Sequence, residues 1–176
     1  MNWENPTVSE FSKLYEEHKN VIFNYILYRV GFNKATAEDL TSEIFLKAWK
    51  AFETFDRSRS FKTWVFAIAH NHLVNFYASG KKQTLSLDEA IEIVKELPSS
   101  EKLNEKLEIE NVMKIVKMLP ESQQELVIMK YVNDMSNTEI AQALNKEEGA
   151  IRTALSRSLT AIRNQYPILF TEKSNG

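Results

Sequence analysis

The chain has 176 residues, 43% of them hydrophobic, and a net charge of −2, values that suit one medium-sized globular domain or two small ones. The absence of cysteine excludes disulfides and thiolate metal sites. No apolar run approaches the roughly 18 residues of a membrane span, and the first residues lack the basic-then-apolar pattern of a signal peptide. We therefore expect a soluble, cytoplasmic protein without membrane insertion.

The acidic residues are concentrated in the middle of the chain. Residues 84–110 carry eight acidic side chains against three lysines, a local charge of −5. Residues 1–83 carry eleven basic against nine acidic residues, and residues 111–176 carry eight against seven. Two flanking modules of slight positive charge can therefore meet an anionic polymer in spite of the negative total.

Almost the whole chain has the apolar periodicity of helices, with only four glycines and four prolines. The first predicted helix follows Pro6 and ends at Gly31. The second begins after Asn33, and the third begins after Ser60 and ends near Ser79. One face of the second helix carries Ala37, Leu40, Ile44, Ala48 and Phe52. We expect these three helices to bury a core of their own.

An acidic segment, residues 84–108, is predicted to be a linker. Helical periodicity resumes behind it and breaks at Pro120. The expected fold is therefore all-α, with two small helical domains at residues 1–83 and 109–176 joined by this acidic linker.

The most specific pattern lies at residues 136–164. Ser136 and Glu139 have the spacing of a capping box, and Asn145 can adopt the left-handed conformation of a tight helix exit. The helix behind this turn has an apolar face and a basic polar face, with no acidic residue between 150 and 166. This order predicts a helix-turn-helix that reads DNA. The alternative is an amphipathic hairpin with a merely solvated outer face.

These residues resemble the small extracytoplasmic-function (ECF) sigma factors of bacterial RNA polymerase. Residues 119–131 (LPESQQELVIMKY), 135–144 (MSNTEIAQAL) and 149–157 (GAIRTALSR) resemble region 4 of that family. Residues 37–49 (AEDLTSEIFLKAW) resemble its polymerase-binding helix in region 2, and residues 61–71 (FKTWVFAIAHN) resemble its promoter-melting helix. The resemblance implies a factor that binds core polymerase, melts the −10 element with the first domain and reads the −35 element with the second.

Asp39 and Glu43 lie four residues apart, outside the apolar face of the second helix. An acidic pair beside an aromatic residue suits a partner helix that carries arginines. The resemblance implies that this partner belongs to the largest catalytic subunits of core RNA polymerase. The residues expected to bind polymerase are Asp39, Glu43, Phe45, Lys47 and Trp49. The alternative is a solvated face of mixed charge.

The loop at residues 54–61 can hold an exposed base, because Asp56 can accept hydrogen bonds while Arg57 and Arg59 hold phosphates. The resemblance implies that this loop captures a flipped base of the −10 element; the alternative is a plain surface connection. The expected −10 contacts are Asp56, Arg57, Ser58, Arg59, Lys62, His70, Asn71, Asn75, Lys81 and Lys82. The expected −35 contacts are Lys146, Glu148, Gly149, Arg152, Thr153, Ser156 and Arg157.

The chain departs from the family pattern at a few positions. Residues 145–147 replace the usual Gly-apolar-Pro turn, Ala154 replaces an arginine of the recognition helix, and His70 replaces an arginine beside Asn71. His70 and His72 are two residues apart, so on a helix they point away from each other and do not form a zinc pair. We expect no metal and no cofactor, with His70 contacting DNA and His72 packed.

The expected function is that of an alternative sigma factor without enzymatic activity, because no catalytic constellation accompanies the carboxylates. Its expected partners are core RNA polymerase and promoter DNA, and the resemblance also allows an anti-sigma factor. Two other classes stay open. One is a conventional regulator that binds DNA without close contact to core polymerase, and the other is a helical adaptor with no role at DNA.

Overall fold

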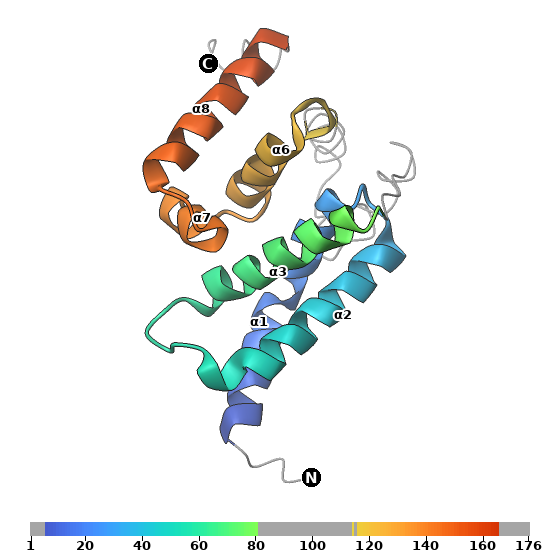
Figure 1. Cartoon of the computed structure of the whole chain (residues 1–176), viewed down its shortest axis with the longest axis vertical. Coiled ribbons are helices and arrows are strands. Elements are labelled where there is room, and N and C mark those ends of the chain that lie inside the picture. The colour runs from blue at the N-terminus through green and yellow to red at the C-terminus, as the bar shows by residue number, and fades with distance from the viewer. Residues whose placement is uncertain (1–5, 81–113, 115, 166–176) are drawn as a thin grey trace, which may run out of the picture.

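The computed structural model describes residues 6–80, 114 and 116–165 of the chain. All regular elements in this part are helical (Figure 1). The first half (residues 6–80) holds α1 (Pro6–Arg29), α2 (Lys34–Ala51), the short 3₁₀ turn η1 (Phe52–Thr54) and α3 (Phe61–Ala78). The second half (residues 114–165) holds α6 (Glu121–Val127), the π-helical turn η2 (Ile128–Val132), α7 (Asn137–Leu144) and α8 (Glu148–Gln165). The all-α prediction is confirmed, and the predicted linker falls outside the described residues.

Local capping fixes where the helices begin. The Asn33 side chain accepts a hydrogen bond from the Thr36 amide at 2.9 Å, and α2 starts directly behind it. Ser60 does the same for α3 through the Thr63 amide at 3.3 Å. The helix starts predicted behind Asn33 and Ser60 are therefore confirmed.

The first half is a three-helix bundle whose core contains the predicted face of α2. All five apolar residues of that face are buried, namely Ala37, Leu40, Ile44, Ala48 and Phe52. Aromatic rings fill the end of the bundle next to η1. Phe61 at the start of α3 makes edge contacts with Phe52 and Phe55 at centroid distances of 6.2 and 5.7 Å. This packing anchors the loop at residues 55–60, which carries several of the predicted −10 contacts.

The second half has the predicted helix-turn-helix. Ser136 and Glu139 form the capping box at the start of α7, with hydrogen bonds of 3.1 and 2.7 Å. α7 ends at Leu144, and the next residue, Asn145, has a left-handed φ of 51°. The amides of Asn145 and Lys146 then return to the carbonyl groups of Gln142 and Ala141. Asn145 thus supplies the conformation that a glycine usually supplies at this exit, and both the capping box and this turn are confirmed.

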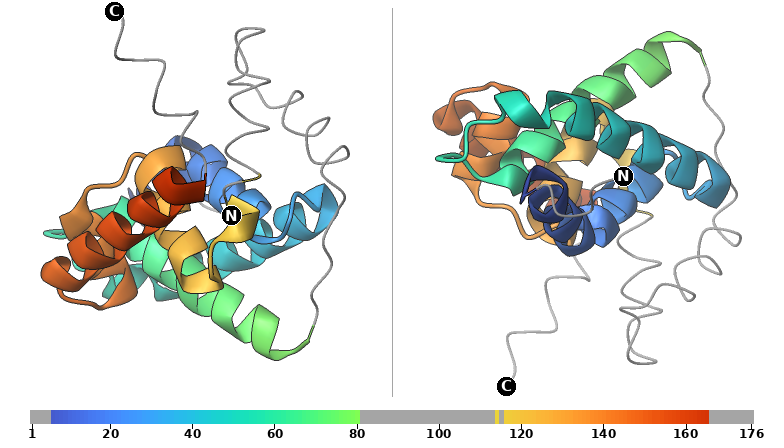
Figure 2. Two further views of the ribbon diagram at one scale, coloured as in Figure 1. Left: turned by 90° about the horizontal axis from the view of Figure 1, so that it is seen from above. Right: turned by 90° about the horizontal axis from the view of Figure 1, so that it is seen from below.

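The two halves pack against each other, α3 against α7 and α1 against η2 (Figures 1 and 2). A single cluster of buried apolar side chains contains residues of both halves. The three helices bury a core, as expected from the sequence, and this core continues into the second half. The cause lies in α3, whose buried residues Phe61, Thr63, Val65, Phe66, Ala69 and Leu73 are spread around the helix. A helix with apolar residues on several faces needs neighbours on more than one side.

Candidate polymerase and DNA interfaces

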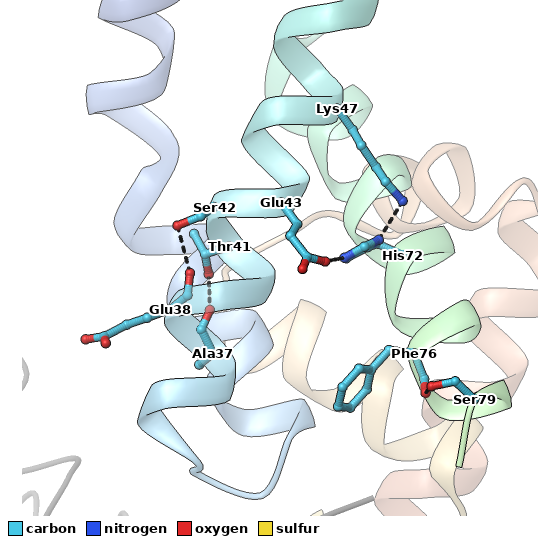
Figure 3. A network of polar contacts seen from close by, with 9 residues as sticks. All are labelled: Ala37, Glu38, Thr41, Ser42, Glu43, Lys47, His72, Phe76 and Ser79. Atoms are coloured by element: carbon cyan, nitrogen blue, oxygen red, sulfur yellow. Dashed lines mark hydrogen bonds and ion pairs between the residues drawn. The ribbon is translucent and has the colours of Figure 1, made fainter. Parts of the chain in front are cut away.

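A polar bridge joins α2 to α3 on the surface predicted to bind polymerase (Figure 3). His72 Nε2 lies 2.7 Å from Glu43 Oε2, and Lys47 Nζ lies 2.7 Å from His72 Nδ1. An ammonium group can only donate, so Nδ1 accepts and the ring proton sits on Nε2, where it donates to Glu43. His72 thereby holds the two charged side chains of α2 in one arrangement. The expectation that His72 is packed is met in part, because its side chain is only 11% exposed.

A small open pocket of about 230 Å³ adjoins this bridge. The pocket lies between α2 and α3. Residues predicted to bind polymerase and residues predicted to contact the −10 element therefore line the same pocket. Its lining residues are Leu40, Glu43, Lys47, His72, Asn75, Phe76 and Ser79. Its lining combines the charged side chains of Glu43 and Lys47 with the ring of Phe76, and Figure 3 shows these three residues together with His72.

Four of the five residues predicted to bind polymerase reach the surface. Asp39, Glu43 and Lys47 are exposed, and Trp49 is 38% exposed while its ring packs on Phe11. Phe45 differs, because it is only 4% exposed and its ring packs against Tyr15 at 4.8 Å. In this structure Phe45 is part of the core beneath this surface, and its side chain is not accessible to a partner.

Leu46 belongs to the same surface, and sequence reasoning missed it. Its side chain is 53% exposed on the same helix as the predicted polymerase contacts. Leu46 is three residues from both Glu43 and Trp49, so the helical period already places it beside them. This spacing was the signal that could have found it.

The loop between η1 and α3 is held by its own side chains. Asp56 Oδ1 accepts hydrogen bonds from the Ser58 hydroxyl at 2.7 Å and from the Ser58 amide at 2.9 Å. These bonds stabilise the carboxylate and lower the pKa of Asp56. The Arg59 amide closes the turn on the Asp56 carbonyl at 3.0 Å. The loop therefore has a defined shape, with Asp56, Ser58 and Arg59 exposed.

Arg57 holds this loop through contacts with its backbone and aromatic rings, although the Arg57 side chain is itself 43% exposed. Its guanidinium donates to the carbonyl groups of Phe52 and Phe55, each at 3.0 Å. It also lies over the Phe52 ring at 4.5 Å and pairs with Glu10 at 3.4 Å. Most of its donors are thus engaged within the protein, in contrast to the phosphate contact predicted for it. Of the neighbouring predicted contacts, the Arg59 side chain is exposed and Lys62 is half-buried.

The remaining predicted −10 residues are divided by the structure. Asn71 and Asn75 are exposed along α3, and Lys81 and Lys82 lie outside the described residues. His70 points to the second half, where its Nδ1 lies 2.7 Å from Glu125 Oε1.

Glu125 is a buried carboxylate that sequence reasoning missed. It is 7% exposed, and the Tyr25 hydroxyl donates to it at 2.5 Å. Burial raises the pKa of Glu125, but the His70 hydrogen bond, the Arg29 charge and the Tyr25 hydrogen bond together lower it below its ordinary value. Burial and the neighbouring carboxylate raise the pKa of Tyr25. We call Tyr25, His70 and Glu125 the Glu125 cluster. Its only sequence signal is that Glu125 precedes the core residue Met129 by one helical turn.

The start of α8 gathers the predicted −35 contacts. All seven are exposed, namely Lys146, Glu148, Gly149, Arg152, Thr153, Ser156 and Arg157. Glu148 accepts a hydrogen bond from Thr138 of α7 at 2.9 Å and lies 4.0 Å from Arg152. The inward face of α8 is buried at Ile151, Leu155 and Ile162, as its periodicity predicts. The helix-turn-helix therefore presents a polar, largely basic face to solvent.

Comparison with known proteins identifies the family of both halves. Residues 14–83 match the family described as Sigma-70 region 2, and residues 109–162 match Sigma-70, region 4. The chain belongs to the sigma-70 family, in its ECF group. The resemblance read from the sequence is thus confirmed, and this sigma factor has the two regions in the family's order.

Two relatives of this sigma factor are ECF RNA polymerase sigma factors. BldN of Streptomyces coelicolor is 34% identical over 162 residues, which are 89% of this chain and 60% of BldN. SigW of Bacillus subtilis is 29% identical over 166 residues, which are 88% of each chain. The chain thus spans less than two thirds of the length of BldN.

Two solved structures share the fold. The sigma factor RpoE of Bartonella quintana, in complex with the anti-sigma factor NepR, has a TM-score of 0.69 at 19% identity. The superposition covers 94% of this chain and all of that one. CnrH, in complex with the cytosolic domain of CnrY, has a TM-score of 0.68 at 19% identity, with 91% and 89% covered. No helix within the described ranges of the sigma factor is long and apolar enough to cross a membrane.

Proposed function

We propose that this sigma factor binds core RNA polymerase through α2, opens the −10 element with α3 and the loop before it, and reads the −35 element with α8. The observation that carries the proposal is the presence of both sigma-70 regions in one chain, each with its predicted polar face exposed. The acidic residues of α2 suit the arginines of a partner helix. The basic face of α8 suits phosphates and the acceptor edges of bases in the major groove.

The proposed division of the chain follows the predicted boundaries. Residues 1–83 form the polymerase-binding and −10 domain, residues 84–108 the acidic linker, and residues 109–176 the −35 domain. The matches at residues 14–83 and 109–162 support this division. The protein acts in the cytoplasm, where polymerase and promoter DNA are found, and it has no enzymatic activity of its own because RNA synthesis belongs to the polymerase. An anti-sigma factor is a further proposed partner, supported by the complex of RpoE with NepR.

Run-off transcription with purified core polymerase tests this function. A library of duplexes with random sequence upstream of a reporter is transcribed by core polymerase alone, by the sigma factor alone and by both together. We expect defined transcripts only from the mixture, and the selected duplexes should share two conserved elements. A conventional regulator would bind DNA without giving core polymerase promoter specificity. An adaptor would show neither activity.

The polymerase surface is tested by reversing its charge. Asp39→Lys with Glu43→Lys should lower the affinity for core polymerase at least tenfold and leave the helix content unchanged, because exposed charges contribute little to folding but matter across an interface. Glu38→Lys is the matched control on the exposed part of the same helix. Equal affinities for all three proteins would remove α2 from the proposed interface.

A further inference from the structure

Gly149 is the second residue of α8 and lies on the exposed face of this helix, among the predicted −35 contacts. Glycine is an unfavourable residue in a helix, because its backbone loses more conformational freedom on folding than that of any other residue. A protein accepts this loss where the backbone conformation or the packing demands a glycine, or where another molecule must come close to the backbone.

The backbone conformation of α8 does not demand a glycine at this position. Gly31 and Gly80 have φ values of 65° and 76°, in the left-handed region where a side chain is strained. Gly149 has no such positive φ and continues the regular helix. An alanine could therefore adopt the same backbone conformation without strain.

Packing within the protein does not demand a glycine either. In the part of the chain that the structure describes, a Cβ atom added at Gly149 would have no heavy atom within 4 Å beyond its chain neighbours and the backbone of its own helical turn. The buried face of α8 begins at Ile151, whereas Gly149 is exposed. The fold would accept an alanine and would be more stable with it. The remaining reason for the glycine is a molecule that approaches α8 from outside.

The neighbouring polar side chains are bound in ways that keep the space beside Gly149 open. Glu148 accepts a hydrogen bond from the Thr138 hydroxyl at 2.9 Å, which draws its carboxylate toward α7. The Thr153 hydroxyl, one turn further along α8, donates to the Gly149 carbonyl at 2.9 Å. A carboxylate that stood over Gly149 would repel a phosphate. The bond from Thr138 therefore favours an anionic partner at this place.

DNA is the partner that this face of α8 is proposed to meet. Arg152 follows Gly149 by three residues, so the helical period places both on one face, and the side chain of Arg152 is 69% exposed. A residue without a side chain cannot read a base edge. It can let the helix come close to the sugar-phosphate backbone, whose contacts fix the position and orientation of a DNA-reading helix.

We propose that the sugar-phosphate backbone of the −35 element lies directly against Gly149, in the space that a Cβ atom would fill, and that this contact sets how deeply α8 enters the major groove. The inference rests on the proposed function of α8 as the −35 reader. Its consequence has opposite signs for stability and for binding. One methyl group added at Gly149 stabilises the free protein and weakens its binding to the −35 element.

Gly149→Ala tests the contact in the full chain. The midpoint of thermal unfolding of the free variant should rise by about 1–4 °C, because alanine restricts the unfolded chain and favours the helix. The binding probe is a duplex with the −35 element that wild-type holoenzyme selects from the random library and with a scrambled −10 element. The affinity of the variant holoenzyme for this duplex should fall about five- to hundredfold, the effect of one methyl group too many in a close contact.

Two further measurements separate contact with the DNA backbone from other effects at Gly149. Gly149→Leu introduces a larger side chain that is also a good helix former, so it should bind the duplex more weakly still while the helix content is kept. Selection from the random library by Gly149→Ala holoenzyme should return the wild-type −35 sequence, because no base-reading side chain has changed.

Gly80→Ala is the matched control, because it adds the same methyl group at a positive φ outside α8. It should lower the unfolding midpoint and leave the −35 affinity unchanged. A Gly149→Ala holoenzyme that binds like the wild type would overturn the proposal. A lower unfolding midpoint of Gly149→Ala would show that the glycine serves the fold, and an altered base preference would place a base at Gly149; either result contradicts the proposal.

Arg152→Ala distinguishes a failure of this contact from a failure of the proposed function. If Arg152→Ala weakens −35 binding and Gly149→Ala does not, α8 still reads the −35 element and only the Gly149 contact is wrong. If neither variant changes the affinity, both the contact and the proposed role of α8 are wrong.

Discussion

Glu43 on α2 and His72 on α3 lie 2.7 Å apart, and the imidazole carries the bridge on to Lys47. The bridge connects a helix predicted to bind polymerase with a helix predicted to melt DNA. Side chains that are held in place before binding lose less entropy when they bind. His72 lies largely beneath the surface and contacts both Glu43 and Lys47. It can therefore hold these two charged side chains in position.

Replacement of His72 should therefore weaken polymerase binding without removing any charge from α2. His72→Leu keeps a buried side chain of similar volume but offers no hydrogen bond to Glu43 or Lys47. We expect the affinity for core polymerase to fall about three- to tenfold, the effect of one lost hydrogen bond or a little more. Titration of labelled core polymerase measures the affinity, and circular dichroism monitors the fold.

His72→Gln provides the matched comparison, because its amide can both donate to Glu43 and accept from Lys47. It should recover at least part of the lost affinity. If His72→Leu binds core polymerase as the wild type does, His72 has only a packing role and the bridge is irrelevant to the interface.

Arg57 and Arg59 lie two residues apart in one loop, but we expect them to contribute differently to the stability of the protein. Arg57 holds the loop through the carbonyl groups of Phe52 and Phe55, so Arg57→Ala should lower the free energy of unfolding by about 1–2 kcal/mol. Arg59 is exposed, so Arg59→Ala should leave the stability within about 0.5 kcal/mol of the wild type. Urea unfolding of both variants measures the difference.

The same two variants test the role of the loop at DNA. Arg59→Ala should slow the opening of a duplex promoter, and a template with a pre-melted −10 region should restore part of the activity. Permanganate reactivity of the −10 thymines reports the opened strand. Normal reactivity with Arg59→Ala, and also with residues 56–60 replaced by a glycine and serine stretch, would show that the loop is a plain connection.

Much of the fold could be predicted because its signals are local. Asn33, Ser60 and Ser136 cap helices through amides three residues away, and such spacings are visible in one sequence. The buried and exposed faces of α2 and α8 follow from the helical period in the same way. The turn at Asn145 was predictable because few residues accept its left-handed backbone.

The contacts that could not be predicted join residues far apart in the sequence. Tyr25 and Glu125 are 100 residues apart, and His70 and Glu125 are 55 apart. A single sequence gives no sign that an acid in an apolar stretch will meet a tyrosine and a histidine from another part of the chain. The bonds of Arg57 to backbone carbonyl groups could not be predicted for a similar reason. Every residue has a carbonyl acceptor, so the sequence does not indicate which ones an arginine will contact.

Acid should weaken the packing of the two halves through Glu125. The pKa of this carboxyl is lower in the folded protein than in the unfolded chain, so the charged group contributes stability at pH values above its ordinary pKa of 4.5. That contribution is lost as the pH falls from 4.5 through the lower value in the folded state. The groups that face Glu125 are Tyr25, His70 and the Arg29 charge. Urea unfolding between pH 3 and pH 7 measures the loss.

Glu125→Gln is the variant that isolates this group, since its amide is similar in size and does not titrate. The difference in stability between the wild type and Glu125→Gln should be largest near neutral pH and shrink as the pH falls below about 4.5. A difference that stays constant over the whole pH range would show that the Glu125 carboxylate contributes no proton-linked stability.

Arg152 and Arg157 should contribute to −35 recognition in different ways. In a helix-turn-helix the residues near the start of the recognition helix contact base edges. Arg152 lies in the first turns of α8, and Glu148 at 4.0 Å can steady its guanidinium, whereas Arg157 is more than a turn further along. Arg152→Ala should therefore cost about 1–3 kcal/mol of promoter affinity and relax the preference at one position. Arg157→Ala should weaken all sequences alike and reduce the salt slope by about one.

Competition binding with a −35 library at several salt concentrations measures both effects. Asn164→Ala, at an exposed position near the end of α8, is the control and should change neither affinity nor preference. If Arg157→Ala relaxes the preference at one position and Arg152→Ala weakens all sequences alike, the two roles are exchanged. In that case α8 still reads the −35 element. If neither arginine alters affinity, preference or salt slope, α8 does not read the promoter, and the exposed basic face is only a solvated surface.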